Sequence, residues 1–437
     1  MFKILILSNG HGEDLSGSLL AKQFVKSGYS VHALPIVGMG NHYEKEKIKI
    51  IGKTKEFRTG GIGYNSFKGR LTEILGGEIF YVLKRLYLTF KIRKKYDYFF
   101  VVGDIVPVFF AWVCKKDFFT YLVAYSSHYE GKLKLPWPSK FFLLSQKAKK
   151  IYTRDSLTAN DLTLQLKKKV SFFGNPFMDK FFPRNKVLNK DEFSIGLFPG
   201  SRFPEILDNF VLILEVLEAL SDLRYFQKIQ FNFAIVNALS SSKIKKIFQK
   251  RGWLKIENNL LKFQYKFLEV NIYWNNFDKI LLKSRCCISM AGTAAEQAIG
   301  LGKPVIQIEG KGPQFTKTFA EAQRRLLGKY VFCASNYKDK NDQINQTIKL
   351  IIKIIYLIQL NRKFMISCNE NGKNRLGENR ACLKMVDDMN IIIISGTKNI
   401  FSKQTSLRFC KSFCKLWTFT FNPVSYTHLT LPTKRIV

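Results

Sequence analysis

The sequence predicts an α/β protein made of two doubly wound domains, each with a parallel sheet covered by helices on both faces. Three observations support this prediction. Short apolar runs typical of strands alternate with helix-like segments over most of the 437 residues. A charged, aperiodic stretch interrupts the alternation once, around residues 180–192, after which it restarts. A chain of this length is also long enough for two or three domains.

In the first half, the order of elements predicts parallel strands joined by crossover helices. Strands are expected at 2–8, 30–37, 97–103, 118–124, 149–154 and 171–174, and helices within 15–27, 69–95 and 155–167. We therefore assign residues 1–180 to an N-terminal domain and residues 181–192 to a linker.

The second half repeats the alternation without repeating the sequence. Strands are expected at 193–198, 231–236, 271–275, 286–290, 304–309 and 330–335, and helices at 204–221, 240–251, 292–301, 316–327, 341–360 and 377–389. These elements define a C-terminal domain, 193–389. Residues 390–437 have no periodicity and end in a stretch resembling translated vector sequence, so we place them outside both domains.

The charge balance indicates an anionic partner. The chain has 70 Lys and Arg against 33 Asp and Glu, a formal net charge of +37. Nucleic acid, an anionic membrane surface and phosphorylated substrates are all compatible with this excess, and so is a merely solvated basic surface. Residues 79–96 alternate apolar and basic positions at helical spacing. That segment suits either an anionic bilayer surface or a helix covering the core with a basic outer face.

Cysteine usage and hydropathy indicate a cytoplasmic protein. The eight cysteines form no C-x-x-C pair, which predicts neither a disulfide framework nor a zinc site, and adjacent Cys286 and Cys287 are expected to be buried strand residues. The N-terminal apolar run has no signal-peptide cleavage pattern. The most apolar window, 98–114, contains Asp104 and Pro107 and is shorter than a membrane span.

The first candidate site is the loop that follows the first expected strand, within the sequence LSNGHGEDLSGSLL at 7–20. A strand, a glycine turn and a helix place free helix N–H groups at the carboxyl edge of the sheet, where ligands of open α/β sheets bind. Gly10 and Gly12 allow close backbone approach. Asp14 is expected to cap a helix beginning near Leu15, and His11 can act as a base near neutral pH.

Two loops of the second half have the same design. In LFPGSRFPEI at 197–206, the amides of Gly200 and Ser201 together with Arg202 are suited to receive a phosphate. In SMAGTAAEQAIGLGKP at 289–304, Gly292 and Thr293 open a helix, and the Glu296 carboxylate lies one turn later, where it can accept hydrogen bonds from ribose hydroxyls. The full phosphate-loop spacing is absent, which excludes a P-loop.

Together these stretches resemble GT-B nucleotide-sugar glycosyltransferases, and most closely the lipid-A-disaccharide synthase family in its "related" branch. The resemblance covers about residues 1–389 and includes GDIVP (103–107), GNPFMD (174–179), LFPGSR (197–202), AGTAAEQAIGLGKPVI (291–306) and GKNRLGENRA (372–381). It implies two Rossmann-like domains facing a cleft, with the acceptor on the first and UDP on the second. The first loop departs from the family form AGExSGD, and the glutamate comes one residue sooner than in the bacterial enzymes.

The resemblance also implies roles for individual residues. The UDP site is carried onto Gly200, Ser201, Arg202, Gly292, Thr293 and Glu296, with Gln297 and residues 312–319 beside the donor. No metal and no cofactor are expected. Inverting transfer needs a base for the acceptor hydroxyl. Asp104 is the first candidate, because its apolar neighbours can raise its pKa, followed by His11 and Asp14. Alternatively, Asp104 only caps a helix.

The resulting hypothesis is a hexosyltransferase that moves a GlcNAc-type sugar from a UDP-sugar to a lipid or glycolipid acceptor, in the cytoplasm at the inner face of a membrane. Two alternatives stay open. One is a UDP-GlcNAc 2-epimerase-like enzyme, which needs no acceptor. The other is a non-catalytic binder of membrane or nucleic acid, although the sequence contains no nucleic-acid-binding motif.

Overall fold

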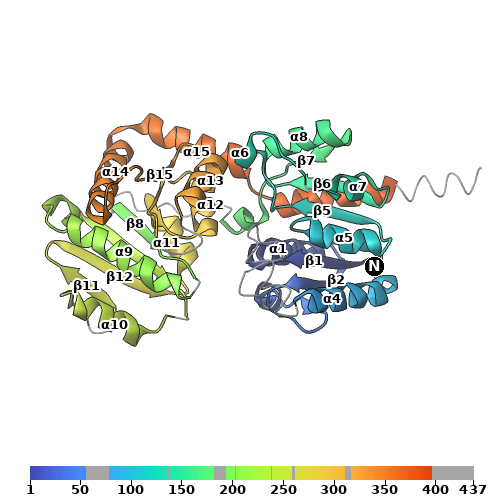
Figure 1. The fold of residues 1–437 in the computed structure, drawn as a ribbon, viewed down its shortest axis with the longest axis horizontal. Helices are drawn as coiled ribbons and strands as arrows, with labels where there is room; N and C mark the ends of the chain where they lie inside the picture. Colours follow the sequence, from blue (N-terminus) through green and yellow to red (C-terminus); the bar gives the residue numbers. More distant parts are fainter. Residues whose placement is uncertain are drawn as a thin grey trace, which may run out of the picture. The chain divides into compact units, whose positions relative to one another are not determined.

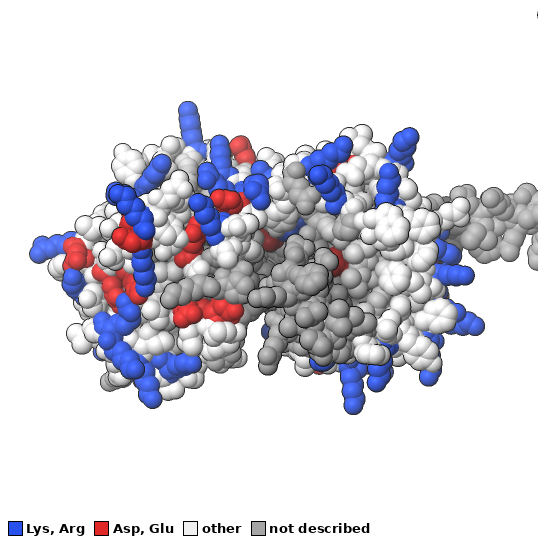
Figure 2. Space-filling view, viewed as in Figure 1, with Lys and Arg blue, Asp and Glu red and all other residues white. Residues whose placement is uncertain are grey.

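The computed structural model describes residues 1–55, 78–135, 137–181, 193–201, 203–237, 239–257, 261–310 and 316–395. The expected linker at 181–192, except Phe181, and the tail beyond residue 395 lie outside these residues. Residues 1–386 form one compact unit. The described part of the chain contains no helix that is both long and apolar enough to cross a membrane. On the visible face, Lys and Arg are spread over both halves of the protein (Figure 2).

The first sheet consists, among the described residues, of seven parallel strands in the order β3-β2-β1-β4-β5-β6-β7 (Figure 1). Their bounds are β1 Lys3–Asn9, β2 Ser30–Val37, β3 Lys49–Ile50, β4 Tyr98–Val102, β5 Phe118–Leu122, β6 Ala148–Thr153 and β7 Val170–Ser171. The reversal of order at β1 and β4 is the switch point of a doubly wound sheet, and it places the loops after these two strands next to each other.

Helices cover both faces of this sheet because its strands are apolar on both sides. Alternate strand residues such as Leu5, Leu7, Phe99 and Val101 belong to one hydrophobic cluster with helices of a single face. Those helices are α4 Glu78–Ile92, α5 Ile105–Val113, α7 Ser139–Leu144 and α8 Ser156–Leu166. The helix α1 His11–Lys26 packs against β1, β2 and β4.

The second sheet has, among the described residues, eight strands in the order β10-β11-β12-β9-β8-β13-β14-β15. Six of them are parallel: β8 Phe193–Phe198, β9 Ile229–Ile235, β12 Leu268–Trp274, β13 Cys286–Ser289, β14 Val305–Gln307 and β15 Val331–Cys333. The short strands β10 Leu254–Lys255 and β11 Lys262–Tyr265 add an antiparallel edge. The parallel core therefore repeats the doubly wound order, as the sequence predicts.

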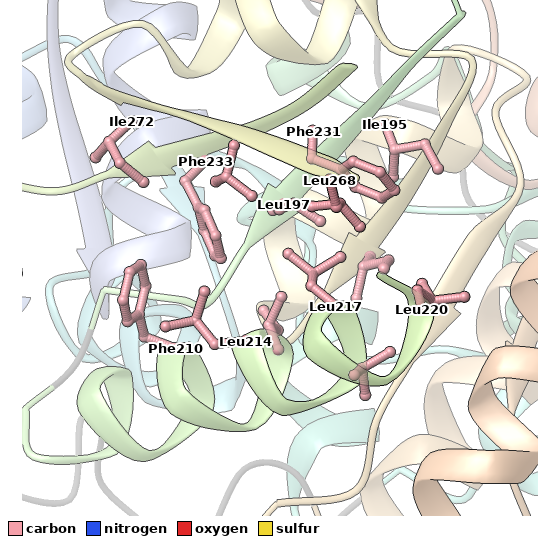
Figure 3. Packing of buried hydrophobic residues seen from close by; sticks show 14 of the residues in the cluster. Ile195, Leu197, Phe210, Leu214, Leu217, Leu220, Phe231, Phe233, Leu268 and Ile272 are labelled. Atoms are coloured by element: carbon pink, nitrogen blue, oxygen red, sulfur yellow. The ribbon is translucent and has the colours of Figure 1, made fainter. Parts of the chain in front are cut away.

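The core of the second half forms where α9 Glu205–Leu220 lies along the sheet. Its residues Phe210, Leu214 and Leu217 point at strand residues such as Leu197 and Phe233 (Figure 3). The other helices are α10 Ser241–Lys250, α11 Phe277–Lys283, α12 Gly292–Gly300, α13 Lys317–Leu327, α14 Lys340–Leu360 and α15 Arg362–Leu376. Cys286 and Cys287 are buried in β13, as predicted.

Two motifs of the resemblance, GNPFMD and GKNRLGENRA, lie against each other. Asn175 Nδ2 donates to the Arg154 carbonyl at 2.9 Å, and the Asn175 amide nitrogen donates to the Leu376 carbonyl at 2.9 Å. The Asp179 carboxylate accepts the backbone N–H groups of Ala381 and Cys382, both at 2.8 Å, at the start of the helical stretch 381–395. These motifs therefore fix the chain where it returns from the second half to the first sheet.

Candidate functional site

The first loop begins at a glycine that no other residue replaces easily. Gly10 has φ +130°, a positive value that would strain the backbone of any residue with a side chain. It is the N-cap of α1, which begins at His11, four residues earlier than the predicted Leu15. The interpretation of Asp14 as the N-cap is therefore wrong, because Asp14 lies inside the first helical turn. The side chain of His11 lies outside the described residues.

Asp14 is instead the end of a buried hydrogen-bond chain. The Tyr43 hydroxyl donates to Ser8 Oγ at 2.9 Å, and Ser8 Oγ donates to Asp14 Oδ1 at 2.6 Å. Burial raises the pKa of Asp14 to about 7, partly offset by the Ser8 hydrogen bond. A Cβ at Gly17 would collide with the Tyr43 hydroxyl, which explains this glycine inside a helix. This series of hydrogen bonds joins α1 to the short helix α2 Asn41–Lys45, which follows β2.

This arrangement predicts a pH effect on stability. Because the pKa of Asp14 is higher in the folded protein (about 7) than the ordinary 3.8, its contribution to the free energy of unfolding is fully present below about pH 4 and is lost as the pH rises through 7. Relative to wild type, Asp14→Asn should therefore gain stability with rising pH, by roughly 1.4 kcal/mol per unit over that window. Urea denaturation at pH 4.5, 6 and 8 measures this difference. The exposed Asp278→Asn variant should show no such trend, and an equal trend in both variants would contradict the assignment.

Two further carboxyl groups meet where β1 and β4 end. Asp104 follows β4 and Gly103, caps α5 by accepting from the Val106 N–H at 2.9 Å, and accepts from Asn9 Nδ2 at 3.0 and 3.1 Å. Asp104 therefore does cap a helix, which was the alternative role expected for it from the sequence. Burial raises the pKa of Asp104 above its ordinary value.

Glu13 is the second of these carboxyl groups. It was not among the bases predicted from the sequence. A Cβ at Gly103 would lie 3.4 Å from Glu13 Cγ, so the side chain runs close beside the Asp104 turn. Burial, with a smaller contribution from the charges of Asp104 and Asp14, raises the pKa of Glu13 to about 7, against the lowering effects of a backbone hydrogen bond and of Arg154. Glu13 can therefore exchange a proton near neutral pH.

In the second half, two helix-opening loops lie together. Gly200 has φ +108°, and a Cβ there would lie 3.2 Å from the Met290 carbonyl, so the loop after β8 touches the loop after β13. Ser201 is exposed, and Arg202 lies outside the described residues. The helix α12 begins at Gly292, and its N-cap Ala291 makes no side-chain cap. Its first N–H groups thus lack the usual capping oxygen.

Buried amides also lie in this part of the second half. Gln323 is buried, its Oε1 has no partner among the described residues, and its Nε2 would lie 3.5 Å from a Cβ on Gly292. Gln307, at the end of β14, is fully buried with neither amide atom paired among the described residues. Buried polar atoms usually have hydrogen-bond partners, so these two amides are suited to bind a polar molecule.

Arg154 joins the two groups of loops. It follows β6, and its Nη2 donates to Glu296 Oε2 at 2.6 Å, with side-chain exposures of only 8% and 13%. Its Nη1 donates to the Val123 carbonyl at 3.1 Å. The Glu296 carboxylate and neighbouring tyrosines raise the pKa of Arg154 further above its usual value against the effect of burial, so it stays charged.

A pocket of ≈ 170 Å³ collects these residues. It is lined by residues of the first turns of α1 and α12, with Arg154 between them: Gly12, Glu13, Ser16, Val123, Ala124, Arg154, Phe177, Thr293 and Glu296. Of the predicted residues it contains Thr293 and Glu296, whereas Asp104, Asp14, Gly200, Ser201, Gly292 and Gln297 do not line it. Gln297 lies within α12, on its buried side. Among the described residues, no three His, Cys, Asp or Glu side chains form a metal-binding group.

A more open hollow of ≈ 400 Å³ lies elsewhere and is lined by Glu321, Arg324, Arg325, Gly328, Lys329 and Arg375. It shares no residue with the pocket and contains none of the helix-opening loops. We assign the candidate site to the smaller pocket, since that is where a group with a pKa near 7 meets a helix N-terminus.

No family model and no curated protein sequence matches this chain. Solved structures do. The calicheamicin glycosyltransferase CalG4 is similar with a TM-score of 0.58 and 13% identity, over 90% of this chain and 98% of that one. The fold is GT-B.

Two other solved structures have TM-scores of 0.50 or above over a similar share of this chain. The Staphylococcus aureus MnaA–UDP co-structure gives a TM-score of 0.55 at 14% identity, over 90% of this chain and 97% of that one. The UDP-GlcNAc 2-epimerase of Neisseria meningitidis, bound to UDP-GlcNAc, gives 0.50 at 16% identity, over 89% and 99%. Identities this low show the fold alone.

Proposed function

We propose that this GT-B protein is a hexosyltransferase that moves a GlcNAc-type sugar from a UDP-sugar to a lipid or glycolipid acceptor, with inversion at the anomeric carbon. The observation that carries the proposal is the pocket in which Glu13 and Arg154 of the first half meet Thr293 and Glu296 of the second. GT-B structures of similar fold hold UDP or UDP-GlcNAc, which supports the class of donor.

The donor side of the pocket offers the groups that a nucleoside diphosphate needs. The uncapped N–H groups of α12 and the exposed Thr293 hydroxyl can bind phosphate oxygens, since a helix N-terminus favours anions. Arg154 binds Glu296 through Oε2, and the carboxylate can accept ribose hydroxyls as well. Arg154 thereby holds Glu296 in place and brings positive charge near the departing UDP.

The acceptor side supplies the base. In the proposed step, the acceptor oxygen forms a bond to the anomeric carbon while the bond from that carbon to the UDP oxygen breaks. The electron pair leaves with UDP, and the acceptor proton passes to Glu13. We assign the base to Glu13 and not to Asp104, because Glu13 lines the pocket whereas both Asp104 oxygens are occupied by Asn9. Asp104 acts by raising the pKa of Glu13.

An epimerase is the second candidate, since a UDP-GlcNAc 2-epimerase bound to its sugar nucleotide has a similar fold. Such an enzyme would change the sugar without an acceptor. We further propose that the protein acts on the cytoplasmic side of a membrane, where a lipid acceptor would be presented.

A screen of UDP-sugars by calorimetry, followed by assays of UDP release with and without a lipid acceptor fraction, tests the proposal. We expect one UDP-sugar to bind and UDP to be released only when acceptor is present. Glu296→Gln should weaken binding about tenfold, as loss of a hydrogen bond to a charged group predicts, whereas the exposed Glu269→Gln should not. Isomerised UDP-sugar without acceptor would support the epimerase, and no binding to any UDP-sugar would rule out both.

A further inference from the structure

The helix α4 has apolar residues on both its inner and its outer face. The inner ones pack on the core of the first half and are Tyr81, Val82, Leu86, Leu88 and Ile92. Arg85 and Thr89 are buried, at 3% and 0% exposure. The Arg85 guanidinium lies under the helix, where it donates to the carbonyls of Pro35, Ile51 and Lys53. The helix is therefore fixed to the first sheet by a buried cation as well as by its inner apolar residues, and a second set of apolar residues faces outward.

Four large apolar residues occupy the outer face. Phe80, Leu83, Tyr87 and Phe90 are exposed by 80%, 54%, 68% and 41%. Their spacing of three, four and three residues places them on one stripe of the helix. Isolated exposed apolar residues are common, but a continuous stripe of them marks an interaction surface.

The stripe continues onto neighbouring helices. α4 packs beside α5, and α5 packs beside α7 (Figure 1). On α7, Phe141 and Leu144 are exposed by 63% and 46%, and the Phe141 ring packs on Trp112 of α5 with centroids 5.5 Å apart. Trp137, just before α7, is 94% exposed. We call the exposed residues Phe80, Leu83, Tyr87, Phe90, Trp137, Phe141 and Leu144 the outer apolar face.

Basic residues predominate around the outer apolar face. The segments 80–96, 105–116 and 132–149, which form this side of the first half, contain no Asp or Glu. Lys84, Lys91 and Lys140 are exposed among the apolar residues, and the Arg93 guanidinium lies 3.5 Å from the centre of the Phe90 ring. Figure 2 shows this side as a largely white surface with Lys and Arg at its margins.

We propose that the outer apolar face is the surface by which the protein docks on an anionic lipid bilayer. Aromatic and leucine side chains enter the interfacial region, while the surrounding lysines and arginines bind anionic headgroups. A bilayer fits better than nucleic acid, because the face contains exposed leucines as well as aromatic residues, and leucine side chains enter a bilayer interface but make no specific contact with phosphates. The inference concerns a surface outside the pocket and does not depend on sugar transfer.

Vesicle co-sedimentation tests this inference with the full chain. Wild type should bind vesicles of phosphatidylcholine containing roughly one third phosphatidylglycerol and bind pure phosphatidylcholine vesicles much more weakly, since lysines and arginines near an anionic surface strengthen binding. The variant Phe80→Ser/Leu83→Ser/Tyr87→Ser should bind the anionic vesicles at least about tenfold more weakly, since it removes three apolar side chains that would enter the bilayer interface.

The matched control is Ile352→Ser/Tyr356→Ser, which removes exposed apolar residues of α14 (42% and 62%) and should leave vesicle binding unchanged. Circular dichroism shows that the variants fold. Lys84→Glu/Lys91→Glu should abolish the preference for anionic vesicles. The inference is overturned if the α4 variant binds like wild type, if the α14 control loses as much, or if wild type binds single-stranded RNA and not vesicles. None of these outcomes bears on UDP-sugar binding, so the two proposals fail separately.

Discussion

Replacing Glu13 by glutamine is expected to reduce the kcat of sugar transfer by about 10²–10⁴-fold, the usual range for loss of a general base. The side chain keeps its size, and an amide cannot take the acceptor proton. The Kd for the UDP-sugar should change little, because the donor groups belong to α12 and Arg154. Single-turnover UDP release measures the first quantity and calorimetry the second.

The pH profile separates Glu13 from its neighbours. The base works in its deprotonated form, so kcat should rise with pH and level off above about 7, where the pKa of Glu13 lies. Glu13→Gln should remove this acid limb. Asp14 also has a pKa of about 7, so Asp14→Asn is the informative control, and it should retain the limb. Loss of the limb in Asp14→Asn, with its retention in Glu13→Gln, would show that the base is misassigned.

The second large effect concerns the buried pair of Arg154 and Glu296. Arg154→Met leaves the Glu296 carboxylate without its 2.6 Å partner in a position of 13% side-chain exposure. We expect the free energy of unfolding to fall by about 3–5 kcal/mol, because an unpaired buried charge is costly. The double variant Arg154→Met/Glu296→Gln should recover much of this loss, since the charge itself is gone. Chemical denaturation of wild type, both single variants and the double variant gives the coupling energy.

A surface pair provides the comparison. Lys180 and Asp278 also form an ion pair, but their side chains are 29% and 52% exposed, so solvent screens the charges. The cycle of Lys180→Met and Asp278→Asn should give a coupling of less than about 1 kcal/mol. Equal couplings for the two pairs, or strictly additive losses for Arg154 and Glu296, would mean that the pair inside the pocket is not structurally important.

The alternation of strands and helices was predictable because each parallel strand is a short apolar run ending in a loop. The strands β1, β4 and β8 lie within a residue or two of their expected bounds. The edge strands β10 and β11 were missed because they are short and polar. The helix α15 was missed because NENG at 369–372 resembles a loop. A Cβ on Gly372 would collide with the Ile299 carbonyl, so close packing on α12, which the local sequence does not show, explains this glycine.

The candidate site was predictable where a local sequence pattern marks it, at the opening of α12. Thr293 and Glu296 lie in the pocket because a helix opening at the carboxyl edge of a sheet is recognisable from its small residues. Glu13 was not among the predicted base candidates, because its closeness to the turn at Gly103 depends on a helix that begins at His11 and not near Leu15. Arg154 has its partner 142 positions away, and no local pattern encodes such a distance.

We propose that UDP binds at the N-terminus of α12, in the pocket that Glu13 and Arg154 share with Glu296. A crystal structure of the protein with UDP measures this directly. We predict the diphosphate on the backbone amides of Gly292 and Thr293, with the ribose beside Glu296. Density for UDP in the hollow of Arg324, Arg325 and Arg375, and none at the N-terminus of α12, would contradict this binding site.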